Sequence, residues 1–370
     1  MNNVHGIVYA YHGFAELREL GTHRTGSSLP FCGRYRLIDF ALSAMMHAGI
    51  HDVGVIMQRD YQSLMDHLGS GRTWDMSRRT GGMRLLPPYG LPNSQKGLYE
   101  GCMEALGAVR SYLGDIRREY VVLHRGDLCA NIDLESLVAH HIASGADVTA
   151  VCTTRAQHRV HHRYVVGPDG FVEQLLCRQT QEERGVASLE VYVMRKERLL
   201  ELVDWCAERS RLHFHRDAMT HLLSEGGRVA VYMHDEWSRM IVSVNDYYEA
   251  SMDMLDERCR RELFDQSRYI TTRERMDAST YYADGARVRN SLIADGCIIE
   301  GDIENSVIFC GVKCAPGAVL RDCIVMNDTV IGANARLKCI ISDKNVKISP
   351  YVALTGNEKL PLVIPKESEI

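Results

Sequence analysis

The fold of the carboxyl-terminal third is decided by a pattern repeated four times: Asn290-Ser291-Leu292-Ile293, Asn305-Ser306-Val307-Ile308, Asp322-Cys323-Ile324-Val325 and Lys338-Cys339-Ile340-Ile341. The copies recur at intervals of 15, 17 and 16 residues, and between them a small residue precedes an aliphatic one about every six residues. Six-residue periodicity is typical of a parallel β-helix, in which three sides make a coil of roughly 18 residues. The spacing predicts such a helix over residues 281–370, and it does not fit a β-sandwich.

The chain has 12 cysteines and no CxxC pair. Five of them fall inside the repeats and are expected to act as small apolar fillers of the coil corners. They are Cys297, Cys310, Cys314, Cys323 and Cys339. The amino terminus lacks the basic start and apolar stretch of a signal peptide. We therefore expect free thiols in a reducing compartment, the cytoplasm.

Residues 1–256 alternate between two kinds of pattern. Short apolar runs predict strands at 6–10, 53–57, 120–124 and 147–151, and helical spacing predicts helices at 36–48, 61–68, 97–113 and 134–144. This alternation predicts an α/β domain with a mostly parallel, Rossmann-like sheet. Such sheets bind ligands beyond the carboxyl ends of their strands, so the loops after Ala10 and Leu123 are candidate binding loops. The polar stretch 257–280 is interpreted as a connector to the second domain.

Composition excludes several classes of protein. Hydrophobic residues make up 45% and charged residues 25% of the 370 residues, which are ordinary values for a globular chain. The net charge of −5, without any block of like charges, argues against a nucleic-acid partner. No apolar run approaches the length of a bilayer span, so we expect no membrane partner.

One group of histidines has to be weighed as a metal site. It comprises His158, His161 and His162, which lie among Arg155, Arg159 and Arg163. Three neighbouring arginines oppose the binding of a cation. We therefore interpret this stretch as a solvated basic loop, and we expect no metal site in the chain.

Residues 29–40 read Leu-Pro-Phe-Cys-Gly-Arg-Tyr-Arg-Leu-Ile-Asp-Phe. They closely resemble the PFGGxYRxIDF segment of the ADP-glucose pyrophosphorylase (glucose-1-phosphate adenylyltransferase) family. The stretch 67–71, His-Leu-Gly-Ser-Gly, and the later Trp74-Asp75 and Leu86-Pro87-Pro88 continue the match. The resemblance covers nearly the whole chain. It implies a nucleotidyltransferase domain followed by a left-handed β-helix.

The chain departs from this family in the motifs that the resemblance assigns to substrate binding and catalysis. The family's GGxGxR phosphate loop falls on 11–16, which holds one glycine and ends in Glu16, a residue that repels phosphate. Of the two Mg²⁺-binding aspartates, Asp127 is kept, but Met240 stands at the position of the other. A thioether does not hold Mg²⁺, which prefers hard oxygen ligands. The sugar-phosphate lysine falls on Cys177, and Glu190 replaces a glycine of a later motif.

What remains resembles a relic substrate pocket made of Tyr99, Asp127 and Ser188. Losing a single charge-stabilising donor costs roughly 10²–10³ in rate, and here several are missing together. The pattern resembles the non-catalytic regulatory (GlgD-type) subunit of the family. The resemblance implies a subunit without a cofactor of its own, acting in glycogen biosynthesis through a catalytic paralogue that requires Mg²⁺, the two forming a hetero-oligomer, a tetramer.

The resemblance also implies a site for a phosphorylated effector between the two domains. Arg24 and Arg36 fall on positions similar to that basic site. The alternative for Arg36 is a structural ion pair with Asp39 or another acid. Two other functions stay open on the sequence: an active glucose-1-phosphate adenylyltransferase, and a stand-alone sensor or scaffold of carbohydrate metabolism.

Overall fold

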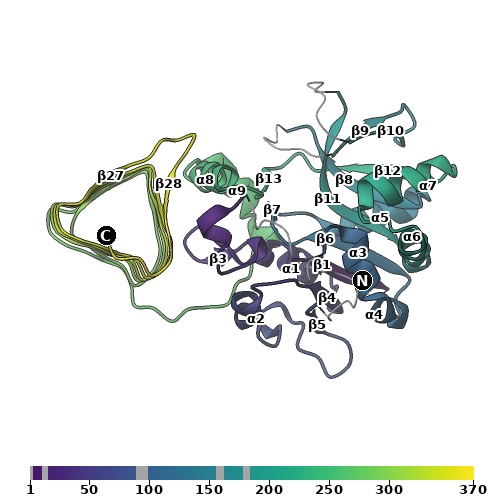
Figure 1. Cartoon of the computed structure of the whole chain (residues 1–370), viewed down its shortest axis with the longest axis horizontal. Coiled ribbons are helices and arrows are strands. Elements are labelled where there is room, and N and C mark those ends of the chain that lie inside the picture. The colour runs from purple at the N-terminus through teal and green to yellow at the C-terminus, as the bar shows by residue number, and fades with distance from the viewer. Residues whose placement is uncertain (1–2, 11–15, 89–98, 156–161, 178–183) are drawn as a thin grey trace.

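The computed structural model describes residues 3–10, 16–88, 99–155, 162–177 and 184–370. An α/β part and a three-sided β-helix lie next to each other (Figure 1). The strands of the main sheet are β1 Val4–Tyr9, β4 Val53–Ile56, β5 Met83–Leu86, β6 Tyr120–Arg125, β8 Val148–Thr153, β9 His162–Val166, β10 Val172–Cys177, β11 Val186–Arg195 and β12 Val229–Met233. The helices are α1 Ile38–His47, α2 Gln62–Leu68, α3 Cys102–Ala108, α4 Arg110–Asp115, α5 Leu134–Ser144, α6 Lys196–Glu208, α7 Thr220–Ser224, α8 Val244–Asp253 and α9 Glu257–Leu263.

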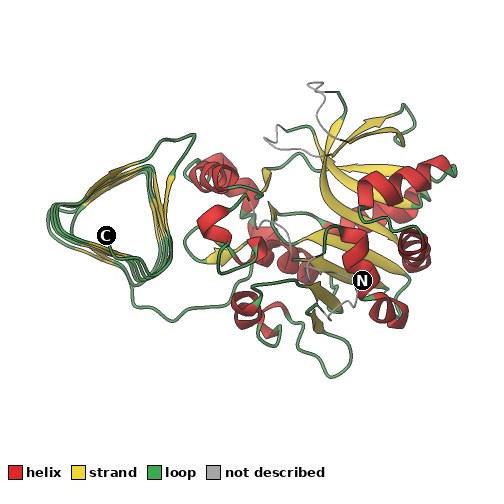
Figure 2. Cartoon of the chain, in the orientation of Figure 1, coloured by secondary structure: helices red, strands yellow, loops and turns green. Residues whose placement is uncertain are grey.

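The main sheet has the order β10-β9-β11-β6-β1-β4-β5, with β8 paired to β11 and β12. Strands β6, β1, β4 and β5 run parallel, whereas β11 is antiparallel to β6 and β8. Alternate residues of β1 enter different cores: Val8 packs with α1 and α5, and Ile7 packs with α3 and α6. Helices therefore cover both faces of the sheet (Figure 2), as the alternating pattern predicts.

Two local predictions differ from the structure. The helical pattern predicted over 97–113 is divided into α3 and α4 at Val109, whose backbone leaves the helical region with φ −105° and ψ 22°. A glycine at 107 and the β-branched Val109 both weaken the helix there. The stretch interpreted as a connector begins with α9, because the Asp256 side chain caps the amides of Arg258 and Cys259 and Leu263 is fully buried.

The β-helix consists of three parallel five-stranded sheets, seen end-on in Figure 1. Their orders are β14-β17-β20-β23-β26, β15-β18-β21-β24-β27 and β16-β19-β22-β25-β28. The strands are β14 Tyr281–Tyr282, β15 Arg287–Arg289, β16 Leu292–Ile293, β17 Ile298–Ile299, β18 Asp302–Glu304, β19 Val307–Ile308, β20 Lys313–Cys314, β21 Val319–Arg321, β22 Ile324–Val325, β23 Val330–Ile331, β24 Arg336–Lys338, β25 Ile340–Ser342, β26 Lys347–Ile348, β27 Ala353–Thr355 and β28 Leu362–Ile364.

The register of the coils follows the repeated pattern. Leu292 pairs with Val307, and Val307 with Ile324. Ile324 in turn pairs with Ile341. The five cysteines of the repeats are buried thiols, as expected of small fillers. The periodicity thus predicted both the β-helix and which residues lie above one another.

The two parts share an apolar core. Phe31 and Phe40 of the α/β part belong to the same buried cluster as Phe309 and Met326 of the β-helix, together with residues of α8. The β-helix is therefore packed onto the α/β part by buried apolar surface, besides being joined to it by the chain. In the described part of the chain, no helix combines the length and the apolar composition needed to cross a bilayer.

Candidate functional site

The first candidate region lies beyond the carboxyl ends of β1 and β6, where the alternating pattern places a ligand. Strand β1 ends at Tyr9, and β6 ends at Arg125, directly before the turn that carries Asp127. All three side chains are buried, with at most 3% of their surface exposed. The loop 11–15 that takes the place of the family's phosphate loop lies outside the described residues.

An arginine occupies the centre of this region. The guanidinium of Arg125 donates to both carboxylate oxygens of Asp127, with Nε–Oδ1 at 2.5 Å and Nη2–Oδ2 at 3.0 Å. Its third nitrogen, Nη1, donates to Oε2 of Glu190 at 2.8 Å. Burial opposes the positive charge, but the two carboxylates outweigh it and hold the pKa of Arg125 well above its usual value. Asp127 is thus engaged by an internal cation.

Glu190 reaches Arg125 from an irregularity in strand β11. The pairing of β11 with β8 shifts register between Ser188 and Tyr192, and Glu190 has a left-handed backbone with φ +55°. Such a conformation costs a non-glycine residue about 1–2 kcal/mol. Hydrogen bonds fix it, because Tyr9 Oη donates to the Glu190 carbonyl at 2.6 Å and the Glu190 amide donates to Ser188 Oγ at 3.1 Å.

Met240 lies beside Asp127, where its sequence position places it. It ends the short strand β13 (Ser238–Met240), which pairs with β7 (Leu128–Ala130) so that Met240 faces Leu128. The amide of Ile241 donates to the carbonyl of Asp127 at 3.1 Å. The Met240 side chain is buried in the apolar core.

These contacts test whether Mg²⁺ fits between the two positions. Mg²⁺ requires hard oxygen ligands in a near-octahedral arrangement. Asp127 is held by the guanidinium of Arg125, and Met240 offers only sulfur. The residues present do not fit the ion that the family uses at this place.

The sequence-predicted pocket is partly assembled. Asp127 and Ser188 belong to one hydrogen-bonded chain that runs through Arg125 and Glu190. Tyr99 is 8% exposed and packs in the apolar cluster that contains Tyr9. The backbone of Cys177 pairs with that of His162 across β10 and β9. His158 and His161 lie outside the described residues.

The second candidate region is a cavity of about 820 Å³ between the α/β part and the β-helix. Arg36 lines it from the α/β part and Lys344 from the β-helix. The side chain of Arg36 bonds Ser63 through Nη1, at 2.6 Å to the carbonyl and 2.9 Å to Oγ. Among the ion pairs of the described residues, neither Arg36 nor Lys344 has a carboxylate partner.

The alternative interpretation of Arg36 can be compared with this geometry. Asp39 Oδ2 accepts a hydrogen bond from the backbone amide of Arg36, and its other oxygen lies 2.5 Å from Nε2 of His67. Both carboxylate oxygens of Asp39 therefore have partners other than the guanidinium of Arg36. Burial and the nearby charge of Arg24 lower the pKa of Arg36 to about 10, against the opposing effect of Asp39.

Arg24 is placed differently. Its Nη2 binds both carboxylate oxygens of Asp343, at 2.7 and 2.8 Å, and the two side chains are 4% and 1% exposed. The guanidinium therefore joins the α/β part to the β-helix.

Lys344 was not found from the sequence. Desolvation, together with the nearby charges of Arg36 and Arg24, lowers the pKa of its ammonium to about 7, against the opposing effect of Asp343. Lys344 lies in a turn of the β-helix, and nothing in the sequence around it indicates that it is desolvated and close to two arginines. Arg125 was missed for the same reason, since an arginine after a buried strand is unremarkable until its partners are known.

Comparisons with known proteins agree with both parts of the structure. The family described as nucleotidyl transferase matches residues 15–257, and the family described as GlmU-like, C-terminal hexapeptide matches residues 278–359. A glucose-1-phosphate adenylyltransferase of Geobacillus stearothermophilus is 32% identical over 83% of this chain and 80% of its own length. A glucose-1-phosphate adenylyltransferase of Bacillus cereus strain Q1 is 30% identical over 83% of this chain and 82% of its own length.

Proposed function

This chain belongs to the glucose-1-phosphate adenylyltransferase family, and from that premise we propose that it is a non-catalytic regulatory subunit of the enzyme in bacterial glycogen synthesis. The observation that carries the proposal is the Arg125 guanidinium bound to both oxygens of Asp127. The carboxylate that the resemblance assigns to Mg²⁺ is neutralised by a side chain of the same protein.

Energetics support the same conclusion. Nucleotidyl transfer depends on positioning and on stabilisation of phosphate charge, and each lost donor costs roughly 10²–10³ in rate. Three groups are changed here: Glu16 stands at the position of the loop arginine, Met240 at that of a metal ligand and Cys177 at that of the sugar-phosphate lysine. Removing Arg125 from Asp127 to admit Mg²⁺ would in addition leave Glu190 without its ion-pair partner.

The proposed role is to bind a catalytic paralogue in a tetramer and to change its response to a phosphorylated effector, with Mg²⁺ acting only in the paralogue. The cavity between the α/β part and the β-helix supports an effector site, because Arg36 and Lys344 line it from opposite sides without carboxylate partners of their own. An arginine can bind a phosphate through two nitrogens.

The test is ADP-glucose formation from ATP and glucose 1-phosphate with Mg²⁺. The purified chain is expected to give the rate of a blank without protein. Mixed with a catalytic paralogue, it is expected to co-elute at the mass of a hetero-oligomer and to change the activity or the effector response. Turnover by the chain alone would overturn the proposal, as would a paralogue that neither binds it nor responds to it.

Reversion variants make this test sharper. Met240→Asp alone and Cys177→Lys alone are expected to give no detectable transfer, because groups that act together give almost nothing singly. Adding Arg125→Ser to Met240→Asp is expected to yield Mg²⁺ binding, still without transfer. Strong activity from one single reversion would show that the pocket is nearly complete.

A further inference from the structure

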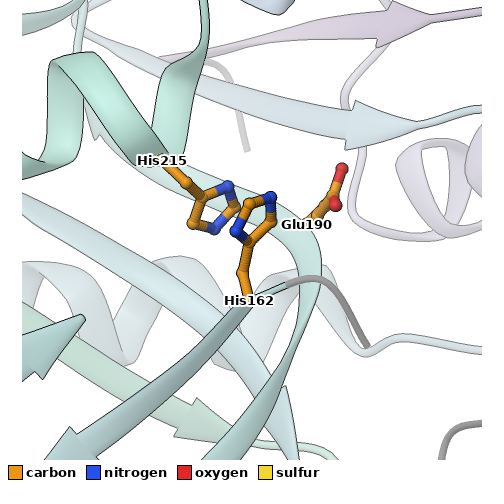
Figure 3. A group of neighbouring side chains, drawn as sticks. All are labelled: His162, Glu190 and His215. Atoms are coloured by element: carbon orange, nitrogen blue, oxygen red, sulfur yellow. The ribbon is translucent and has the colours of Figure 1, made fainter. Parts of the chain in front are cut away.

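Glu190 also belongs to a second polar cluster. This cluster contains His162, the first residue of β9, and His215, in the π-helix Phe214–Met219. One candidate ligand atom from each of His162, Glu190 and His215 lies within 4.8 Å of the other two. Figure 3 shows the two imidazole rings face to face with the Glu190 side chain beside them. The ring centroids are 3.8 Å apart and the planes differ by 10°.

We propose that His162, Glu190 and His215 form a binding site for a divalent transition-metal ion of the Zn²⁺ class. Two imidazoles and one carboxylate are a ligand set that Zn²⁺ uses where a further position stays open to water or another small ligand. The proposal does not rest on the regulatory function, although the two share Glu190, which also pairs with Arg125.

His215 is already oriented as a metal ligand would be. Its Nε2 lies 2.6 Å from the hydroxyl of Tyr164 and 2.6 Å from that of Tyr192. Both phenols contact one ring nitrogen, so in the tautomer that is protonated at Nε2 the other nitrogen, Nδ1, is the atom that would bind the ion. Hydrogen bonds of this kind to the remote nitrogen fix the tautomer and the ring direction of metal-binding histidines.

The local charge favours a cation. Arg125 contributes one positive charge, and Asp127 and Glu190 contribute two negative charges, so this ion cluster carries a net charge of −1. Glu190 holds Arg125 through Oε2, and a carboxylate has a second oxygen with which it can contact an ion.

In the sequence analysis, neighbouring arginines argued against a metal site. In the structure, two of these arginines bind other groups of the protein. Arg155 is paired with Glu262 at 2.7 Å, and Arg163 donates to the carbonyl of Gly185 at 3.0 Å. Arg159 lies outside the described residues. His162 therefore acts with residues distant in the chain, which the spacing of His158 and His161 did not suggest.

Binding requires a small adjustment. Ligand atoms around tetrahedral Zn²⁺ lie roughly 3.4 Å apart, given bonds of about 2.0–2.1 Å. From separations of up to 4.8 Å, the ligand atoms must therefore approach one another by at most about 1.4 Å, and the His162 ring must tilt out of the stack. His162 is half-buried and begins its strand, so this rotation displaces little of the core.

The experiment is a titration of metal-stripped full-length chain with Zn²⁺ in competition with a chromophoric chelator, with Mg²⁺ as a second probe. One equivalent of Zn²⁺ is expected to bind and to resist excess Mg²⁺. The His162→Gln variant is expected to weaken this binding more than about 100-fold, because loss of an outer hydrogen-bond partner alone costs about 10–100-fold. Visible ligand-field bands of Co²⁺-substituted protein should disappear in the same variant.

Controls separate this site from adventitious binding. His140→Gln removes an exposed histidine of α5 that contacts Tyr232, and it is expected to leave the affinity for Zn²⁺ unchanged. Tyr164→Phe removes one hydroxyl from Nε2 of His215 and is expected to weaken binding about tenfold. Far-ultraviolet circular dichroism without metal verifies that the variants fold. The proposal is overturned if the wild type binds no stoichiometric Zn²⁺, or if His162→Gln binds it as tightly as His140→Gln does.

Discussion

The first candidate region and the junction of the two parts both hold a buried arginine beside a carboxylate, and they differ in what the neighbouring positive charges face. In the first candidate region, all three bonding nitrogens of Arg125 are directed at carboxylates of the same chain. At the junction, Arg24 is paired in the same way, but Arg36 and Lys344 line a cavity of about 820 Å³ and have no carboxylate partner among the ion pairs of the described residues. Two acidic residues that line the same cavity, Asp295 and Asp328, are paired with other arginines.

The difference has an energetic consequence. A buried ion pair contributes little to stability relative to an apolar replacement, yet removing one partner is costly. A cation without a carboxylate partner, beside a cavity, carries the cost of partial desolvation without that compensation. We propose that a bound anion supplies the missing negative charge, and substitutions at Arg125, Arg24, Arg36 and Lys344 test this contrast.

The largest effect is expected from Arg125→Ala. It leaves Asp127 and Glu190 as buried carboxylates without a cation, and should lower the free energy of unfolding by about 3–5 kcal/mol. Urea denaturation measures the change. The control combines Arg125→Met with Asp127→Asn and Glu190→Gln, which removes all three charges and should recover most of the loss. A single variant as stable as the wild type would show that the pocket is not closed by this cluster.

Arg24→Ala comes next, with an expected loss of about 3 kcal/mol, because it leaves a single buried carboxylate, Asp343, without its partner. The matched control is Arg34→Ala. It breaks the exposed pair with Asp295, which should be worth no more than about 1 kcal/mol. Equal losses in the two variants would argue that Arg24 is not a structural link. If stability is kept while the effector response is lost, the effector role expected from the sequence holds instead.

Arg36→Ala is expected to change the melting temperature little, since its guanidinium bonds only the carbonyl and hydroxyl of Ser63. If Arg36 binds the effector, the loss of one charged hydrogen bond, about 1.5–3 kcal/mol, should weaken the effector response of the mixed enzyme roughly 10- to 100-fold. The control is Arg110→Ala, which removes an exposed arginine that does not line the cavity. A variant that fails to fold would assign Arg36 a structural role.

The smallest effect concerns pH and Lys344. The pKa of Lys344 is lowered to about 7, so between pH 7 and its usual 10.5 the unfolded chain binds more protons at this site. Stability should therefore rise with pH through this window in the wild type relative to Lys344→Met. A bound dianion favours the charged lysine, so affinity for sulfate should fall about tenfold from pH 6 to pH 8.

Two measurements check this prediction: sulfate titration by calorimetry and urea denaturation across the same pH range. His67 also lines the cavity, so His67→Gln is the control for the contribution of that side chain. An unchanged pH profile in Lys344→Met would remove this lysine from the proposed site.

Much of the fold was predictable because it follows from local periodicity. Leu292, Val307, Ile324 and Ile341 stack because each occupies the same place in a repeat, and no distant contact is needed to specify that. Met240 and Asp127 were each assigned to a position of the family's metal site from separate matched motifs, and the structure places the two close together. The division of the predicted helix at Val109 was not predicted from the sequence. A β-branched residue is tolerated in a helix when packing favours it, so its presence alone does not mark a helix end.

The sequence by itself determined the order of the two domains, the coils of the β-helix and the departures from the family's motifs at Glu16, Met240 and Cys177. Only the tertiary structure decided which side chains meet one another. Arg125 meets Glu190, Arg24 meets Asp343 and His162 meets His215 across separate elements of the fold. A periodic pattern records which face of an element is buried, but the partner of a charge depends on which elements the core brings together. That choice is made by packing over the whole chain.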